Sequence, residues 1–290
     1  MDFLRPTTWP DALAAKAEHP DAVPIAGGTD VMVELNFDLR RPSALLDLTG
    51  VRELAEWGWA DGRVRLGAGV PYTRVITELG DWLPGLAMAS RTVGSPQIRN
   101  RGTVGGNLGS ASPAGDAHPA LLAARAQVEV ASTNGSRRIS IDDFFTGVKR
   151  HALQPDELIS AVWITPPSGP QQFSKIGTRN AMVIAVCAFG LALHPDRRAI
   201  GTGIGSAAPT PIRAGDAEWF LATALETTGL WDSRGDLPDK LVGAFANRVR
   251  DAAEPIDDVR GSAAYRRHAL HVMARRTLTW AWTDYQKAGV

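Results

Sequence analysis

The sequence predicts an α+β protein in which short helices and strands hold two glycine-rich segments, followed by a separate C-terminal unit. The first segment is Ala26-Gly27-Gly28-Thr29-Asp30, and the second spans residues 103–116, where glycine recurs at short intervals. Around Asn134-Gly135, apolar and polar residues alternate as in a β-hairpin with a tight turn. Residues 166–170 read Pro-Pro-Ser-Gly-Pro, which neither a helix nor a strand tolerates, so they are predicted to link two units.

The N-terminal elements are predicted from apolar periodicity and from capping residues. Thr29 and Asp30 both carry oxygens that accept from free N–H groups, so one of them is expected to cap the helix beginning at Val31. In order, the predicted elements are a helix at 10–19, a strand at 22–26, a helix at 31–38, strands at 44–48 and 64–68, and helices at 72–79, 84–93 and 119–124. The first glycine-rich segment thus lies between a strand and a helix.

The pattern changes after residue 126, where strand signals become denser. Residues 128–132 and 138–141 are predicted to pair as the hairpin, and 159–164 to form another strand. Beyond the linker we expect a short element at 173–177, a buried helix or strand at 182–193, a strand at 200–205, and then helices. Near the end, apolar-side residues recur at helical spacing and arginines lie mostly on the other face: Leu270, Met273, Thr277 and Trp280 against Arg266, Arg267, Arg275 and Arg276.

Composition excludes several classes of function. The chain of 290 residues is 44% hydrophobic and 21% charged, and its 31 Lys and Arg balance 31 Asp and Glu. No general affinity for nucleic acid or for a membrane surface is therefore expected. The apolar stretch 181–193 is too short to cross a bilayer, and the first residues lack the pattern of a secretory signal. The single cysteine, Cys187, excludes an internal disulfide and an all-cysteine metal or iron–sulfur site, so a cytoplasmic location is expected.

The paired glycine-rich segments are the strongest functional signal from the residues themselves. Glycine leaves backbone N–H groups accessible, and such groups bind anions, above all phosphates. Two segments far apart in sequence indicate one extended ligand held from two sides, as a dinucleotide would be. Asn107, Ser110, Ser112 and Asp116 add side chains able to hydrogen-bond ribityl or ribose hydroxyls. Arg99 and Arg101 are candidates for a pyrophosphate contact, although single exposed arginines are more often plain surface residues.

Other patterns favour structural explanations. Residues 203–208 fit a dinucleotide fingerprint formally, but Pro209 and Pro211 follow at once, so no helix begins where the pyrophosphate needs one. His268 and His271 have a spacing that metals use, yet a basic surface helix explains them better. His118 lies just past the second segment, where it either approaches the ligand or caps the next helix. Cys187 is expected to be an inert core residue.

Several motifs, taken in order, resemble one known family. They are Pro24-Ile25-Ala26-Gly27-Gly28-Thr29-Asp30, QIRNRGTVGGN at 97–107, ASPAGD at 111–116, FSKIGTR at 173–179, GSAAPTP at 205–211 and DVRGSAAYR at 258–266. Together they resemble the FAD-binding medium subunit of the molybdenum hydroxylases, the family of xanthine dehydrogenase and carbon monoxide dehydrogenase. The resemblance covers nearly the whole chain.

The resemblance implies a fold and a domain division. The expected fold is the FAD-binding PCMH type, like that of vanillyl-alcohol oxidase, with two α+β subdomains holding FAD between them. A C-terminal antiparallel sheet-and-helix domain of the CO dehydrogenase type would follow. The expected boundaries are 1–169 for the FAD-binding domain, with subdomains of about 1–55 and 56–169, and 170–290 for the C-terminal domain.

The resemblance also assigns residues to the cofactor. The positions that would wrap the pyrophosphate are Pro24, Ile25, Ala26, Gly27, Gly28, Thr29, Asp30 and Val31, continued by Thr103, Gly105, Gly106 and Asn107. Asp116 would bind hydroxyls on the adenosine side, whereas Ile159 and Lys175 match positions that approach the flavin ring. A cation such as Lys175 near the pyrimidine edge would stabilise the negative charge that reduction places there.

The family's complexes imply partners. An iron–sulfur small subunit and a molybdopterin large subunit would join this oxidoreductase subunit in a dimer of heterotrimers. Electrons would pass from the partner's clusters to FAD and on to NAD+, a quinone or oxygen, while substrate is hydroxylated at the partner's molybdenum. Carbon monoxide dehydrogenase flavin subunits tend to read Gly-Gly-His-Ser where this chain has Gly27-Gly28-Thr29-Asp30, which favours a purine or other N-heterocycle, or an aldehyde. The alternatives are a carbon monoxide dehydrogenase medium subunit, a stand-alone FAD oxidoreductase, and a flavin-free scaffold.

Overall fold

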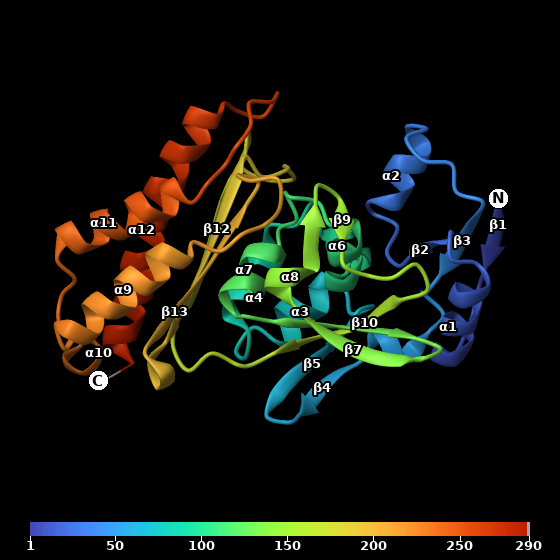
Figure 1. Cartoon of the computed structure of the whole chain (residues 1–290), viewed down its shortest axis with the longest axis horizontal. Helices are drawn as coiled ribbons and strands as arrows, with labels where there is room; N and C mark the ends of the chain where they lie inside the picture. Colours follow the sequence, from blue (N-terminus) through green and yellow to red (C-terminus); the bar gives the residue numbers. More distant parts are fainter. Residues whose placement is uncertain (289–290) are drawn as a thin grey trace.

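The computed structural model describes residues 1–288 and arranges them around three main β-sheets (Figure 1). The first sheet is parallel, in the order β1 (Asp2–Leu4), β3 (Ala44–Asp47) and β2 (Val23–Ile25). Helix α1 (Trp9–Glu18) is capped by Thr8, whose hydroxyl accepts from the N–H of Asp11 (3.3 Å), and α2 (Val31–Asn36) follows β2. The two helices and two strands predicted here are confirmed to within two residues, whereas β1 was not predicted.

The second sheet is antiparallel, in the order β4 (Trp57–Ala60), β5 (Arg63–Gly67), β10 (Leu158–Ile164), β6 (Gln127–Ser132) and β7 (Gly135–Ser140). All seven residues of the central strand β10 are buried. The predicted hairpin is confirmed as β6 and β7. Its turn is Thr133-Asn134 rather than Asn134-Gly135, because Gly135 already pairs with Ser132.

Short helices and a two-stranded ribbon pack around this second sheet. They are the 3₁₀ turn η1 (Arg52–Ala55), α3 (Tyr72–Glu78), α4 (Pro84–Arg91), α5 (Pro96–Arg101), α6 (Val104–Ser110), α7 (His118–Ala123), α8 (Ile141–Phe144), β8 (Phe145–Gly147) and β9 (Arg150–His151). Of these, α3, α4 and α7 were predicted. Buried apolar side chains from the first two sheets and these helices form one continuous core.

The C-terminal unit is a three-stranded antiparallel sheet of β11 (Gln171–Ile176), β12 (Cys187–His194) and β13 (Ala199–Gly205), with the 3₁₀ turn η2 (Pro195–Arg197) between the last two strands. Helices α9 (Gly215–Thr227), α11 (Asp239–Asp251) and α12 (Ala263–Lys287) cover one face, with α10 (Leu230–Ser233) beside them (Figure 1). A second core lies between sheet and helices. The ambiguous segment 182–193 is a strand from Cys187 onward.

The C-terminal helix was predicted correctly, but two of its side chains were not. Trp280, assigned to the buried stripe, is 47% exposed. Arg266, assigned to the exposed face, is 1% exposed, because its guanidinium donates to the carbonyl of Ser206 and to Asp258 Oδ1. These two contacts bind α12 to the loops before it, and long-range contacts of this kind leave no periodic signal in the sequence.

Helix α7 covers the other face of the C-terminal sheet, and its main chain packs directly against the main chain of β13. A Cβ built on Gly203 would lie 2.1 Å from the carbonyl oxygen of Pro119, and one on Gly201 would lie 2.0 Å from that of Ala123. Residues 203–205 therefore belong to strand β13 and form no dinucleotide turn, as the following prolines indicated. Glycine at these positions lets helix and sheet touch directly.

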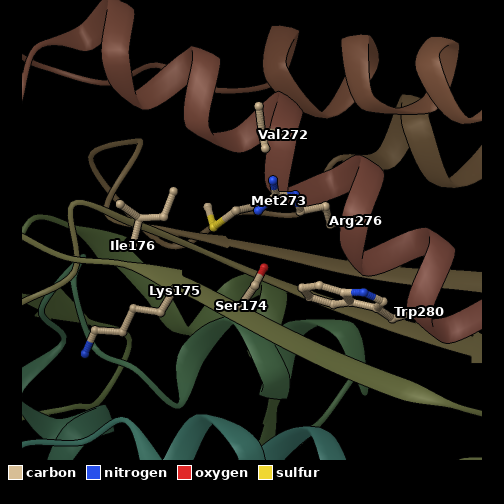
Figure 2. A pocket seen from close by; sticks show the side chains of 7 residues that line it. All are labelled: Ser174, Lys175, Ile176, Val272, Met273, Arg276 and Trp280. Atoms are coloured by element: carbon tan, nitrogen blue, oxygen red, sulfur yellow. The ribbon is translucent and has the colours of Figure 1, made fainter. Parts of the chain in front are cut away.

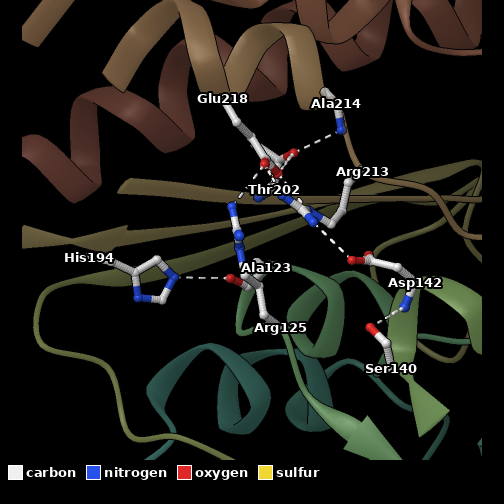
Figure 3. A network of polar contacts seen from close by, with 9 residues as sticks. All are labelled: Ala123, Arg125, Ser140, Asp142, His194, Thr202, Arg213, Ala214 and Glu218. Atoms are coloured by element: carbon white, nitrogen blue, oxygen red, sulfur yellow. Dashed lines mark hydrogen bonds and ion pairs between the residues drawn. The ribbon is translucent and has the colours of Figure 1, made fainter. Parts of the chain in front are cut away.

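A buried polar network joins the same two units (Figure 3). The carboxylate of Glu218 on α9 accepts from the N–H and the hydroxyl of Thr202 on β13, at 2.8 and 2.7 Å, and from Arg213. Arg213 also donates to Asp142 Oδ2 on α8 at 2.9 Å. Because a buried carboxylate is costly without partners, this network favours a single arrangement of the C-terminal unit on the rest of the chain.

The contact between α7 and β13 predicts the effect of one added methyl group. Gly203→Ala would force a Cβ onto the Pro119 carbonyl, and we expect it to lower the free energy of unfolding by about 1–3 kcal/mol, measured by urea denaturation. The matched control is Gly243→Ala on α11, where a Cβ meets nothing within 4 Å and where we expect a gain of about 0.5–1 kcal/mol. Equal stability of the two variants would contradict the packing described.

Candidate functional site

The first glycine-rich segment forms a tight turn between β2 and α2. Gly28 has a φ of +75°, which glycine adopts without a Cβ penalty. Its carbonyl accepts from the N–H of Met32 at 3.0 Å. Asp30 occupies the N-cap position, but its side chain makes no capping bond, so the predicted capping by Thr29 or Asp30 is wrong. The reason is local: the backbone of Asp30 is helical (φ −103°, ψ −52°), whereas a capping residue needs an extended backbone.

The structure brings the two glycine-rich segments into direct contact. A Cβ built on Gly27 would lie 1.8 Å from the carbonyl oxygen of Arg101, so the two backbones touch where a larger residue cannot fit. A Cβ on the adjoining Gly102 would lie 3.4 Å from the Thr29 hydroxyl. Segments about 75 residues apart in the chain therefore form a single surface, as expected for two loops that hold one ligand.

Part of the second segment is a helix rather than a loop. Thr103 caps α6, and its hydroxyl accepts from the N–H of Gly106 at 2.9 Å. Gly105 faces inward, where a Cβ would lie 2.5 Å from the Ala68 carbonyl oxygen. The glycine-rich composition hid this helix, because glycine is a poor helix former and close packing compensates for it here.

The exposed side of α6 is bare. A Cβ on Gly106 would meet only the Thr103 hydroxyl, at 3.1 Å, and one on Gly109 would meet only the side chain of Ile159, at 3.9 Å. The two glycines lie one helical turn apart, so α6 presents no Cβ at either position on this side. This side of α6 has room for a ligand that approaches the main chain.

Asp116 and Lys175 form a buried ion pair beside these segments. Lys175 Nζ donates to Asp116 Oδ2 at 2.8 Å and to the Thr92 carbonyl at 3.2 Å. Burial raises the pKa of Asp116 to about 6, although the Lys175 ammonium acts in the opposite direction. The pair joins strand β11 of the C-terminal unit to the second glycine-rich segment.

The side chain of Lys175 points away from the pocket between β11 and α12, into which the neighbouring Ser174 points (Figure 2). Successive residues of a strand face opposite sides of the sheet, so only Lys175 is directed to the glycine-rich segments. The resemblance assigned Asp116 and Lys175 to opposite ends of an extended ligand. In the structure the two side chains are in contact at 2.8 Å.

Buried polar atoms without partners gather around the site. Among residues 1–288, the buried side-chain atoms that lack a hydrogen-bond partner include Tyr72 Oη, Asn107 Oδ1, Asp116 Oδ1 and His118 Nδ1. Buried polar groups in native proteins are nearly always paired, so four of them on neighbouring segments indicate a ligand with several hydrogen-bonding groups. Oxygens of Asn and ionised Asp accept hydrogen bonds, which suits the hydroxyls of a ribityl or ribose group.

His118 lies under this site rather than at a cap. It is the first residue of α7, where no side chain makes a capping bond, and its Nε2 is 3.2 Å from the Asn107 carbonyl oxygen. Burial lowers the pKa of His118 to about 4, so the ring is neutral at pH 7. A Cβ on Gly115 would lie 2.2 Å from this ring, which shows how closely the loop passes over it.

The remaining predicted residues lie on the same elements. Val31 begins α2, and Pro24 and Ile25 belong to β2, which Ala26 follows. Ser112 is engaged locally, because its hydroxyl accepts from the N–H of Ala114 at 3.3 Å. Arg99 Nη1 donates to the Val93 carbonyl at 3.0 Å, so this side chain holds its own loop.

Tyr72 lies beside these segments and was not singled out from the sequence. It begins α3, its side chain is 2% exposed, and its N–H donates to the Gly102 carbonyl at 3.0 Å. The only signal was its position directly after Pro71, which marks a helix start and says nothing about a ligand. Its role depends on contacts between distant segments.

Residues 1–288 contain neither a cluster of metal ligands nor a helix able to span a membrane. No three His, Cys, Asp or Glu side chains gather there as metal ligands require. None of the described helices combines the length and the apolar character that crossing a bilayer demands. Cys187 is fully buried in β12, and burial raises the pKa of its thiol to about 12, so it is unreactive at neutral pH.

Nearly the whole chain is similar to known protein families. Residues 1–167 match the family described as the FAD binding domain in molybdopterin dehydrogenase, and residues 172–281 match the CO dehydrogenase flavoprotein C-terminal domain. The caffeine dehydrogenase subunit beta of a Pseudomonas species is 33% identical over 291 residues, covering 90% of this chain and 98% of that protein. The nicotinate dehydrogenase FAD-subunit of Eubacterium barkeri is 32% identical over 211 residues, covering 70% and 71%.

Solved structures agree with these relatives. A chain of the CO dehydrogenase from Oligotropha carboxidovorans superimposes with a TM-score of 0.88 at 26% identity, covering 98% of both chains. The sheets and the helices over them therefore have a known counterpart. This chain belongs to the family of FAD-binding medium subunits of the molybdenum hydroxylases, and its cofactor is FAD.

Proposed function

We propose that this chain carries electrons within a molybdenum hydroxylase complex, from the iron–sulfur clusters of a partner subunit to an external acceptor. The observation that carries the proposal is the bare, polar surface where the two FAD-binding segments meet, in a chain whose single cysteine is buried. One cysteine cannot hold an iron–sulfur cluster, so any cluster that supplies electrons to the flavin must lie outside these 290 residues.

The residues divide the work of holding FAD. Bound FAD supplies a redox centre that takes up and releases electrons. The backbone of Gly106 would approach the diphosphate, because on that side of α6 no Cβ stands in the way. The turn at residues 26–30 would lie beside it. Asn107 Oδ1 and Asp116 Oδ1 would accept from hydroxyl groups, which gives each buried oxygen its missing partner.

Lys175 brings positive charge to the same place. Its ammonium is 6% exposed and touches Asp116, so its charge acts through a medium of low dielectric constant. We propose that Lys175 lies near the pyrimidine edge of the flavin, where its charge would stabilise the anion that reduction creates. Asp116 Oδ2 would then orient the ammonium, while its Oδ1 would accept from a hydroxyl of the cofactor.

For the substrate of the complex we propose an N-heterocycle. Two relatives at 32% and 33% identity are subunits of nicotinate and caffeine dehydrogenases, and both names denote nitrogen heterocycles. The substrate would react at a molybdenum site in a large partner subunit. An iron–sulfur small subunit would complete a heterotrimer, and NAD+, a quinone or oxygen would receive the electrons.

Substitution at Gly106 tests the cofactor surface. In Gly106→Val the side chain would enter the space over α6 and block approach to the backbone, so we expect purified protein to lose its flavin absorbance while the unliganded chain keeps its far-UV spectrum. The neighbouring Gly105→Val is the contrasting control, because its Cβ strikes Ala68 and should impair folding itself. Normal flavin content in the Gly106 variant would contradict the placement of FAD on α6.

Purification of the tagged chain from its own host tests the partners. We expect an iron–sulfur protein and a molybdopterin protein to copurify, identified by mass spectrometry, and the flavin in that complex to bleach when an N-heterocycle is added without an acceptor. Bleaching should stop when the partners are removed, because this chain has no cluster of its own. Turnover of substrate by the isolated chain would instead establish a stand-alone oxidoreductase.

A further inference from the structure

Tyr72 is tied by its backbone to the place where the glycine-rich segments meet. Its N–H donates to the Gly102 carbonyl at 3.0 Å, and the preceding Pro71 forms a β-bridge with Thr103. A Cβ on Gly102 would lie 3.5 Å from the Tyr72 ring and 3.4 Å from the Thr29 hydroxyl. The ring therefore packs against the contact between the first and second segments.

The hydroxyl of Tyr72 is buried and has no hydrogen-bond partner among residues 1–288. A phenol buried in this way costs free energy that a phenylalanine of nearly the same shape would avoid. Buried hydroxyls of tyrosine usually find a partner, so the missing acceptor is expected to come from outside the chain. Asn107 Oδ1 and Asp116 Oδ1 lack partners in the same region.

The charges facing Tyr72 identify the kind of acceptor. Burial raises the pKa of this phenol, and the carboxylates of Asp116 and Asp30 raise it further, so the group keeps its proton and donates. Of these two carboxylates, only that of Asp116 is paired with Lys175. Their negative charge disfavours a further anion, such as phosphate, beside the hydroxyl. A neutral alcohol both accepts from Tyr72 and donates to the unpaired oxygens of Asn107 and Asp116.

We propose that the Tyr72 hydroxyl binds FAD directly, by donating a hydrogen bond to a hydroxyl oxygen of one of the cofactor's sugar-alcohol groups. The inference rests on FAD binding by this chain and adds a contact outside both glycine-rich segments. The ribityl chain of the flavin and the ribose of the adenosine share this chemistry. Tyr72 would thus read the polyol of the cofactor, while the glycines accommodate its phosphates.

Tyr72→Phe tests the proposal because it removes one oxygen and little volume. We expect the full chain to bind FAD about 3- to 10-fold more weakly, measured by titration of the apoprotein with FAD, which is the effect of one hydrogen bond. The melting temperature of the apoprotein should stay equal or rise, because the lost hydroxyl had no protein partner. A purely structural tyrosine would show the reverse, with a lower melting temperature and unchanged FAD affinity.

Tyr285→Phe is the matched control. The Tyr285 hydroxyl donates to the Trp231 carbonyl at 2.8 Å in the C-terminal core, away from the glycine-rich segments. We expect this variant to melt lower by about 2–4 °C and to bind FAD as the unsubstituted chain does. Tyr72→Phe should therefore lower FAD affinity without lowering the melting temperature, whereas Tyr285→Phe should lower the melting temperature without changing FAD affinity.

Competition with fragments of FAD distinguishes the two sugar groups. Riboflavin carries the ribityl chain, and ADP carries the ribose and the diphosphate. Each fragment is used to displace FAD from the unsubstituted protein and from the Tyr72→Phe variant. A Tyr72→Phe defect seen with riboflavin alone assigns the ribityl chain, and one seen with ADP alone assigns the ribose. Equal FAD affinity of Tyr72→Phe and unsubstituted protein would overturn the inference while leaving the electron-transfer role intact. Failure of the unsubstituted chain to bind FAD would overturn that role instead.

Discussion

Backbone-to-backbone contact at glycine is the constraint on which the rest of this structure depends. At Gly27 the first segment packs on the Arg101 carbonyl, at Gly105 helix α6 packs on Ala68, and at Gly203 strand β13 packs on α7. At each joint the space for a side chain is taken by main-chain atoms of another element. Since protein interiors are packed as densely as crystals, such joints fix how the elements lie relative to one another. The surface that we propose for FAD is the one left open where the first two of these contacts adjoin.

Much of the fold could be predicted because its signals are local. The hairpin of β6 and β7, the helices at 72–78 and 84–91 and the C-terminal helix each follow from periodicity or turn residues within a short window. Strand β1 and helix α6 could not be predicted in this way. The first is stabilised by parallel pairing with β3, and the second by a cap at Thr103 and by burial of Gly105 against Ala68, which follows β5. The strand pairing and the packing of Gly105 are long-range contacts that leave no pattern in their own segments.

The candidate site also has features that local sequence signals predict and features that depend on long-range contacts. Glycine-rich segments are visible in sequence because they differ from ordinary composition, and the structure places both on one surface. Which glycine faces a neighbour and which faces open space is a property of the fold, as Gly105 and Gly106 show. The ion pair of Asp116 with Lys175 and the unpaired hydroxyl of Tyr72 likewise arise between elements distant in the chain. No inspection of single motifs would have brought those three side chains together.

The direct seating of the C-terminal sheet on α7 bears on how such subunits can be recombined. The sheet has no side-chain layer of its own at Gly190, Gly201 and Gly203, since carbonyl groups of α7 occupy that layer. A fragment starting at the proline-rich linker would expose bare main chain to water along this face. A chimera that exchanges the C-terminal unit between relatives must therefore carry α7 with it, although α7 precedes the linker by more than forty residues. The unit that can be exchanged is therefore defined by packing contacts and is not one continuous stretch of sequence.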